Sequence, residues 1–308
     1  MRLGLLLNFL LKQNFRKDFL IARPLVLFAL FAALAGCVTK PAARTESTKA
    51  QAVASTRSQY AAEPTRTNIK GVLPANLALK ITNDFGEVRL RFGGFEHAFE
   101  VTAVAQAPIG QAMPGVRFDA QSGAIATFLP VGTAAALGQR IDIVVFVPEK
   151  HDVQVSTLRG MVEIRSLRSA VTVRSDSGNI AARGVQAAMD LQTGSGSIDV
   201  SLNDVPLNTQ QRFNTRTGVI TASFGPAQVA ELALSTSALI ATEFSVEISE
   251  RPGEEPNKTG VVRLAGVANG VAANPQELLT AQAKNKIELS SKRGELRLYR
   301  RQAYLDAD

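Results

Sequence analysis

The sequence predicts an all-β fold, a β-solenoid or β-helix-like stack of strand repeats joined by glycine-containing turns. Three observations lead to this prediction. Apolar and polar residues alternate in short runs, glycines recur between the runs, and a small polar residue precedes each glycine by three positions. Alternation with a period of two is typical of half-buried strands. A repeat that cannot bury its own apolar face becomes stable only when neighbouring copies stack.

The repeats are clearest between residues 153 and 223, where the turn glycines are spaced by 18, 18 and 22 residues. Valine or isoleucine stands two positions after each of these glycines, and further copies follow the same pattern. Because glycine adopts positive φ at little cost, we expect it to supply that conformation in these turns. The expected structural turn glycines are Gly86, Gly160, Gly178, Gly196, Gly218, Gly260 and Gly294.

The anchor of each repeat is its turn glycine, or the residue that stands in the place of that glycine. The position three residues before the anchor is always Ser, Thr or Asn. Such side chains bond the nearby backbone and favour turns. Stacked coils would align them into a ladder spaced by about 4.8 Å. Turn formation in every coil is the favoured interpretation, and a ladder that binds carbohydrate or ions is the alternative. One copy has Ala238 at the anchor, with a shifted apolar pattern that indicates a slip. The Ser, Thr and Asn residues of this row, the polar ladder, are Asn83, Thr157, Ser175, Thr193, Thr215, Ser235, Asn257 and Ser291.

A second fold remains open at this stage, an antiparallel β-sandwich, because Ser-Gly turns also close hairpins. The segment 141–167 (IDIVVFVPEKHDVQVSTLRGMVEIRSL) resembles the bacterial "putative adhesin" β-strand-repeat family. In that family, a β-rich run ending in Val-Pro leads into glycine-turn repeats. The resemblance extends over residues 77–300. It implies an adhesin-like or scaffolding role, and it implies no catalytic residues.

The first 36 residues read as a lipoprotein signal peptide. A basic segment precedes a short apolar core at 24–33, which is shorter than the roughly 20 apolar residues that span a bilayer. The motif Leu34-Ala35-Gly36-Cys37 resembles the bacterial lipobox. That resemblance implies cleavage before Cys37, the only cysteine in the chain, and attachment of a palmitate-type lipid to its thiol. A transmembrane anchor is the alternative.

The remaining chain divides into a tether and one folded domain. Residues 37–70 are rich in Ala, Thr, Ser and charged residues without apolar periodicity, and they predict a disordered tether. Residues 71–308 predict a single β-repeat domain, with core repeats at 153–248 and a closing repeat at 287–299. Val38 follows the cysteine, and by analogy with other lipoproteins it points to the outer membrane.

The basic balance of the chain belongs to its first segments. The net charge is +7 overall, but +4 falls on residues 1–36 and +4 on residues 38–70, which leaves −1 for residues 71–308. A near-neutral domain gives no reason to expect nucleic-acid binding. We therefore expect the partners to be membrane lipid, through acylated Cys37, and a polymer or protein of the envelope.

No pattern in the chain indicates catalysis, a metal or a cofactor. The only two histidines, His97 and His151, lie 54 residues apart and outside any ligand motif. No Gly-x-Ser-x-Gly motif occurs. Asp176, Asp190 and Asp199 fall on three different rows of the predicted coils, and Glu163 shares a row with Asp199 but is separated from it by Ala181, so no carboxylate pair for sugar hydrolysis emerges. Arg91, Arg165 and Arg183 share one row, which favours a solvated face over an anion-binding strip.

Together these observations predict a membrane-anchored bacterial lipoprotein of the cell envelope. Its β-repeat domain is expected to act without catalysis, as an adhesin-like or envelope scaffold and binding module. Two alternatives remain at this stage, an enzyme acting on envelope polysaccharide and a regulatory or stress-related envelope protein.

Overall fold

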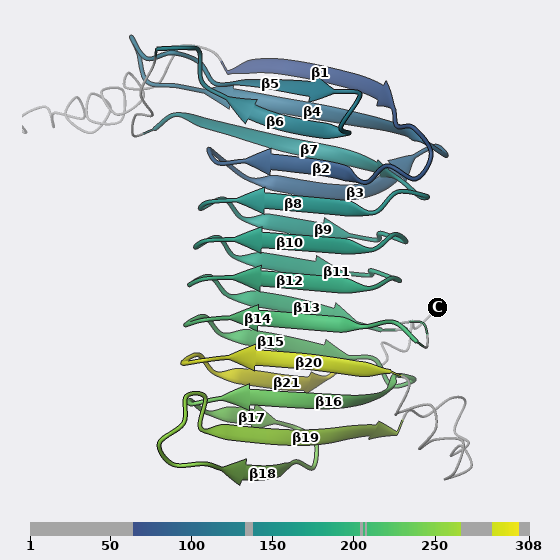
Figure 1. Ribbon diagram of the computed structural model, residues 1–308, viewed down its shortest axis with the longest axis vertical. Coiled ribbons are helices and arrows are strands. Elements are labelled where there is room, and N and C mark those ends of the chain that lie inside the picture. The colour runs from purple at the N-terminus through teal and green to yellow at the C-terminus, as the bar shows by residue number, and fades with distance from the viewer. Residues whose placement is uncertain (1–63, 133–137, 204–205, 207, 266–284, 302–308) are drawn as a thin grey trace, which may run out of the picture. The chain divides into compact units, whose positions relative to one another are not determined.

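The computed structural model describes residues 64–132, 138–203, 206, 208–265 and 285–301 (Figure 1). Every regular element within these ranges is a β-strand. The strands form two sheets, and the central strands in both are parallel. The predicted β-solenoid is therefore confirmed, and the antiparallel sandwich is wrong for the central repeats. Within the described ranges, no helix is long and apolar enough to cross a membrane.

The strand bounds are β1 Thr65–Val72, β2 Leu79–Asn83, β3 Val88–Gly94, β4 Ala98–Gln106, β5 Gly115–Asp119, β6 Ala124–Phe128, β7 Arg140–Pro148, β8 Val153–Thr157, β9 Val162–Arg165, β10 Val171–Ser175, β11 Ile180–Arg183, β12 Met189–Thr193, β13 Ile198–Leu202, β14 Gln211–Thr215, β15 Ile220–Phe224, β16 Val229–Thr236, β17 Ile240–Thr242, β18 Glu247–Glu250, β19 Lys258–Ala265, β20 Lys286–Ser291 and β21 Leu296–Arg300.

Each central coil gives one strand to each sheet. In one sheet β8, β10, β12 and β14 lie side by side, and in the other β9, β11, β13 and β15 do. The register is that of the repeat: Val173 lies opposite Val155 on one side and Leu191 on the other. Inward residues of all these strands are buried and form one continuous core between the sheets. Period-two alternation thus places one apolar layer inside and one polar layer outside.

The turn glycines are required for a reason other than the one expected. The turn glycines of the coils do not adopt positive φ, so the predicted left-handed conformation is wrong. These glycines are Gly86, Gly160, Gly178, Gly196, Gly218 and Gly294. Instead, a Cβ on Gly178 would overlap the carbonyl oxygen of Gly160 in the preceding coil. The same overlap with the preceding glycine recurs at Gly160, Gly196, Gly218 and Gly294, whereas Gly86 meets the carbonyl of Ile141. These glycines let successive turns approach closely.

Two repeat assignments near the C-terminal end need correction. Gly260 is not a turn glycine, because it lies inside strand β19. Asn257 accordingly does not belong to the polar ladder. In the coil anchored at Ala238, Thr236 takes the ladder position instead of Ser235, because Thr236 pairs with Ser291 in register. The turn is one residue shorter there, which is the slip that the shifted apolar pattern indicated.

The order of coils in the stack differs from their order in the chain. Strands β20 and β21 lie between β14–β15 and β16–β17, so the repeat at 287–299 does not close the stack as predicted. Similarly, β2 and β3 lie between β6–β7 and β8–β9. At each end, the outermost coil is therefore not the first or last repeat in the sequence. The first repeat (β2–β3) and the last repeat (β20–β21) each lie one coil inside the end of the stack.

Antiparallel strands cover both ends. At one end β4 pairs with β7 and β1 pairs with β4, while β5 pairs with β6 in the other sheet; we call the set β1 and β4–β7 the N-terminal cap. At the other end β19 joins β16 to β18. β1 begins at Thr65, inside the segment predicted as a disordered tether, so the ordered domain starts before residue 71.

Candidate functional site

The hydroxyls of the polar ladder bond the backbone of the turns. Thr193 is buried, accepts a hydrogen bond from Gly196 N at 3.2 Å and donates one to Gly178 O at 3.0 Å. Thr215 repeats this arrangement one coil later, with Gly218 N and Gly196 O both at 3.1 Å. These two hydroxyls therefore hold their own turns and clamp them to the coil before, whereas Thr157 and Ser175 bond only the glycine N–H of their own turns. The geometry supports the turn interpretation over a carbohydrate or ion ladder.

The charged rows on the outer faces are largely neutralised. Arg91, Arg165 and Arg183 share a row as expected. Glu163 accepts a hydrogen bond from Arg91 Nη2 at 2.6 Å and also pairs with Arg165, while Arg183 lies 3.7 Å from Asp199. The hydrogen bond from Arg91 is the main cause that lowers the pKa of Glu163 below its ordinary range. This row is a network of ion pairs, and it carries no unpaired strip of cations.

The fold brings together the only two histidines of the chain, which are 54 residues apart in the sequence. His97 Nδ1 lies 2.7 Å from His151 Nε2, and His151 Nδ1 lies 2.7 Å from Leu77 O. His151 is 1% exposed. Among the described residues, no three His, Cys, Asp or Glu side chains gather in a manner that could hold a metal ion. The pair links the β3–β4 connection to the start of β8.

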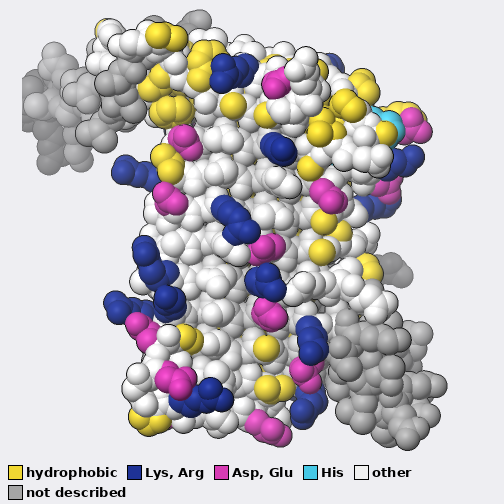
Figure 2. Space-filling view, in the orientation of Figure 1, with side chains coloured by type: hydrophobic (Ala, Val, Ile, Leu, Met, Phe, Trp, Pro, Cys, Tyr) yellow, Lys and Arg dark blue, Asp and Glu magenta, His cyan; other side chains and the backbone are white. Residues whose placement is uncertain are grey.

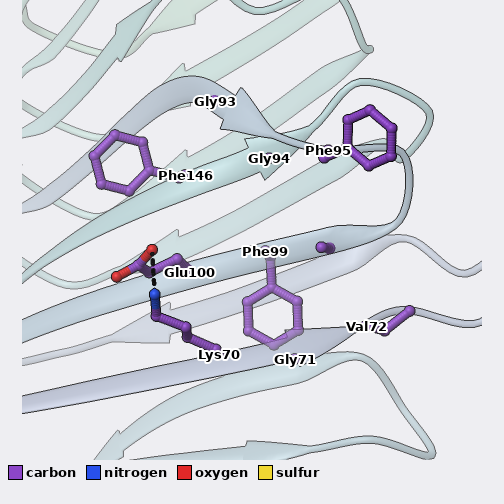
Figure 3. A pocket seen from close by; sticks show the side chains of 10 residues that line it. Lys70, Gly71, Val72, Gly93, Gly94, Phe95, Phe99, Glu100 and Phe146 are labelled. Atoms are coloured by element: carbon purple, nitrogen blue, oxygen red, sulfur yellow. Dashed lines mark ion pairs between the residues drawn. The ribbon is translucent and has the colours of Figure 1, made fainter.

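An open pocket of about 610 Å³ lies on the outer face of the N-terminal cap (Figure 3). Residues of β1, β3, β4 and β7 line it, together with Phe95 from the β3–β4 connection. Phe146 and Phe95 lie on either side of the Gly93–Gly94 backbone, and all four residues line the pocket. Volumes of roughly 300–1,000 Å³ with apolar, aromatic walls are typical of ligand sites.

Local sequence explains why this space is open. A Cβ on Gly93 would approach Phe146 Cδ1 at 2.9 Å, and Gly93 has φ of +159°, close to extended backbone. Gly94 is tighter, because its Cβ would meet the carbonyl of Ala98. The pairing of β3 with β7 shifts register between Phe92 and Gly94. This irregularity turns the chain out of the sheet and directs Phe95 to the surface.

One ion pair borders the pocket. Lys70 Nζ lies 3.2 Å from Glu100 Oε2 across the β1–β4 pair, and the lysine side chain remains 74% exposed. On the apolar side, Val72 is 68% exposed and Phe95 is 79% exposed. On the face shown in Figure 2, hydrophobic side chains gather mainly over the N-terminal cap, while the central coils present polar and charged ones. The cap thus combines an apolar recess with a polar border.

The sequence-predicted site residues divide into two groups. The lipobox residues Leu34, Ala35, Gly36 and Cys37 lie outside the described residues, so lipid attachment stays a prediction. The turn glycines other than Gly260 line one edge of the stack. Sequence reasoning missed the pocket at Val72, Phe95 and Phe146. The sole hint was the run Phe92-Gly-Gly-Phe95, where two glycines interrupt an alternating strand.

Comparisons with known proteins give one distant similarity. No family model matches the chain, and no curated protein matches it. A solved structure described as a "putative cell adhesion protein", from Clostridium sporogenes ATCC 15579, is similar over 78% of this chain and 100% of its own. The sequence identity is 10% and the TM-score is 0.40. At this distance the likeness carries no functional inference.

Proposed function

We propose that this protein is a lipid-anchored, non-enzymatic binding module of the bacterial cell envelope, which holds an envelope or surface partner at its N-terminal cap. The anchor is Cys37, and the segment after it keeps the domain at a distance from the bilayer. The coil stack acts as the scaffold. An adhesin-like role is the form of binding that the resemblance to adhesin-type repeats favours.

The pocket on the cap is the observation that supports this proposal most. Thr193 and Thr215, which face inward along the coils, bond the backbone of the coils themselves, and Glu163 and Asp199 on the outer rows are ion-paired. In contrast, Val72 and Phe95 remain exposed around a recess that no described side chain fills. Exposed apolar groups around a recess, with polar residues at the rim, are typical of interaction sites.

Two experiments test the proposal in cells of a Gram-negative host that carry the full chain. In the first, labelled palmitate is supplied and the membrane fraction is examined. Wild-type protein should be labelled and membrane-bound, whereas Cys37→Ala should be unlabelled and released. Persistent labelling of Cys37→Ala would rule out this anchor.

The second experiment asks whether the cap binds a partner. Chemical cross-linking in intact cells should give the same adduct with wild-type protein and with Ile109→Ser. Val72→Ser combined with Phe95→Ser should lose it. Ile109 is a matched control because it is 68% exposed, as Val72 is, and lies outside the pocket. Equal adducts from all three proteins would contradict binding at the cap.

A further inference from the structure

We propose that the N-terminal cap binds its partner by strand addition. An extended segment of a partner polypeptide pairs with the open edge of β1 and places an apolar side chain against Val72, at the mouth of the pocket. This inference rests on the proposed binding function and specifies the partner chemistry. The expected segment carries an apolar residue and an acidic residue six positions apart, so that both lie on the same face of the added strand.

The first support is the edge itself. β1 is the last strand of its sheet, and among the described residues it pairs only with β4. That pairing runs through eight consecutive residue pairs without a bulge. In an antiparallel strand, alternate residues direct their N–H and C=O groups away from the existing partner. β1 therefore presents a regular row of backbone donors and acceptors.

The other edges of the stack are much less suited to pairing. β17 has three residues, β18 has four and β5 has five, whereas β1 has eight and contains no proline. Proteins usually protect open edges by keeping them short, bulged or interrupted by proline. β1 carries two basic side chains, but it is neither short nor bulged, and proline does not interrupt it. Within the described part of the chain, β1 is thus the one long edge strand with a single partner, and it lies at the end of the molecule that also carries the pocket.

The second support is the position of the pocket along this edge. Lys70, Gly71 and Val72 form the last part of β1 and also line the pocket. An added strand lies about 4.8 Å away and directs alternate side chains to the pocket face. A diagonal neighbour across a strand pair remains within reach of an aromatic side chain. In strand addition, the backbone supplies affinity and such recesses supply side-chain selectivity.

The third support is charge, which also identifies the occupant. Arg66, Asn68, Lys70 and Val72 alternate along β1 and are all exposed. Arg66 forms no ion pair with a described residue, whereas Lys70 already pairs with Glu100. An acidic residue opposite Arg66 and an apolar residue opposite Val72 would complement this row. A second copy of β1 would bring basic residues near basic residues, so self-pairing is disfavoured.

The direct test uses two synthetic peptides with the full chain. One has the order Phe-Thr-Gln-Thr-Gln-Thr-Glu, which matches antiparallel addition from Val72 to Arg66, and the other has the reverse order. Fluorescence polarisation of the labelled peptides gives affinity, and NMR amide exchange reports on β1. We expect one peptide to bind and to slow exchange at alternate β1 residues.

Variants make the result specific. Arg66→Glu should weaken binding roughly fivefold, and a peptide with Lys in place of Glu should restore it, because opposite charges across strands attract. Val72→Ser and Phe95→Ser should each weaken binding roughly tenfold through lost apolar contact. Ile109→Ser should leave affinity unchanged. Failure of the charge exchange to restore affinity would overturn the assigned register.

Other outcomes separate this inference from the proposed function. If neither peptide binds, or if one binds without protecting β1, strand addition is wrong, even where cells still yield the Val72-dependent adduct. If β1 becomes protected only as protein concentration rises, the occupant is a second copy. If the cellular adduct itself does not depend on Val72 and Phe95, the proposed function fails and not merely its binding mode.

Discussion

The central coils and the N-terminal cap are both built from β-strands, but they differ in how many of their polar and apolar groups are already bonded or buried. In the coils, Thr193 and Thr215 each hold two backbone groups, each turn glycine contacts the preceding turn, and the Glu163 row is ion-paired. In the cap, pairing becomes antiparallel, β1 pairs with β4 alone among the described strands, and Val72 and Phe95 stay exposed.

This difference indicates where function resides. A repeat that satisfies itself coil by coil is a good scaffold, because each coil interacts only with its neighbours. The same self-sufficiency leaves few groups for a partner. The cap departs from the repeat, and each departure exposes something that can bind. The following predictions test this contrast, beginning with the largest expected effect.

Gly178→Ala should be among the most damaging single substitutions in the coils. The added Cβ would overlap the Gly160 carbonyl oxygen, so two coils would have to separate. We expect a loss of about 3 kcal/mol or more in the free energy of unfolding, measured by urea titration. Gly110→Ala in the cap is the control. Gly110 has φ of +79° and an open surrounding, so its cost should be about 1 kcal/mol. Equal costs would contradict the close-approach role.

Thr215→Val should have the next largest effect. The substitution keeps the shape but removes the hydroxyl that Gly218 N and Gly196 O share, and it leaves both buried groups without this partner. Such a loss costs about 1–3 kcal/mol. Thr215→Ser should retain most of the stability. Thr221→Val on the outer face should change the free energy of unfolding by less than about 0.5 kcal/mol in the same urea titrations. A neutral Thr215→Val would show that the ladder does not hold the turns.

Glu163→Gln should give the smallest effect, visible mainly as a change in pH dependence. Arg91 and then Arg165 lower the pKa of Glu163 in the folded state below its ordinary value of 4.5. Its contribution to stability is therefore present above that value and is lost as pH falls through the folded-state pKa.

The measurement is the melting temperature of both proteins from neutral pH to pH 3. The variant should be less stable at neutral pH, and the difference should shrink in acid. Parallel curves for the two proteins would mean that the ion-pair network contributes nothing to the folded state.

Local patterns in the sequence were sufficient to predict the coils, but they were insufficient to predict how the two ends of the stack are built. Val153 to Ser223 predicts the strands, because side-chain alternation and turn chemistry are local properties. The role of Gly178 could not be read from the chain, since the atom that excludes a Cβ belongs to Gly160 in another coil. For the same reason the repeat at 287–299 could not be placed, because its pattern fits between any two coils.

The candidate site was harder still to predict. Val72, Phe95 and Phe146 lie in three separate segments and share no spacing. Only the register shift at Phe92–Gly94 and the antiparallel pairing of β1 bring them together. His97 and His151 show the same limit, because their contact depends on the order of coils at the cap.

Site-specific photo-cross-linking in intact cells tests most directly whether the cap, and not the coils, engages the partner. A photo-reactive residue is placed at Val72 in the cap or at Leu158 in a central coil, and both positions are exposed apolar residues. We predict a discrete adduct from position 72 and none of comparable yield from position 158. An adduct from position 158 alone would contradict the assignment of scaffold to the coils and binding to the cap.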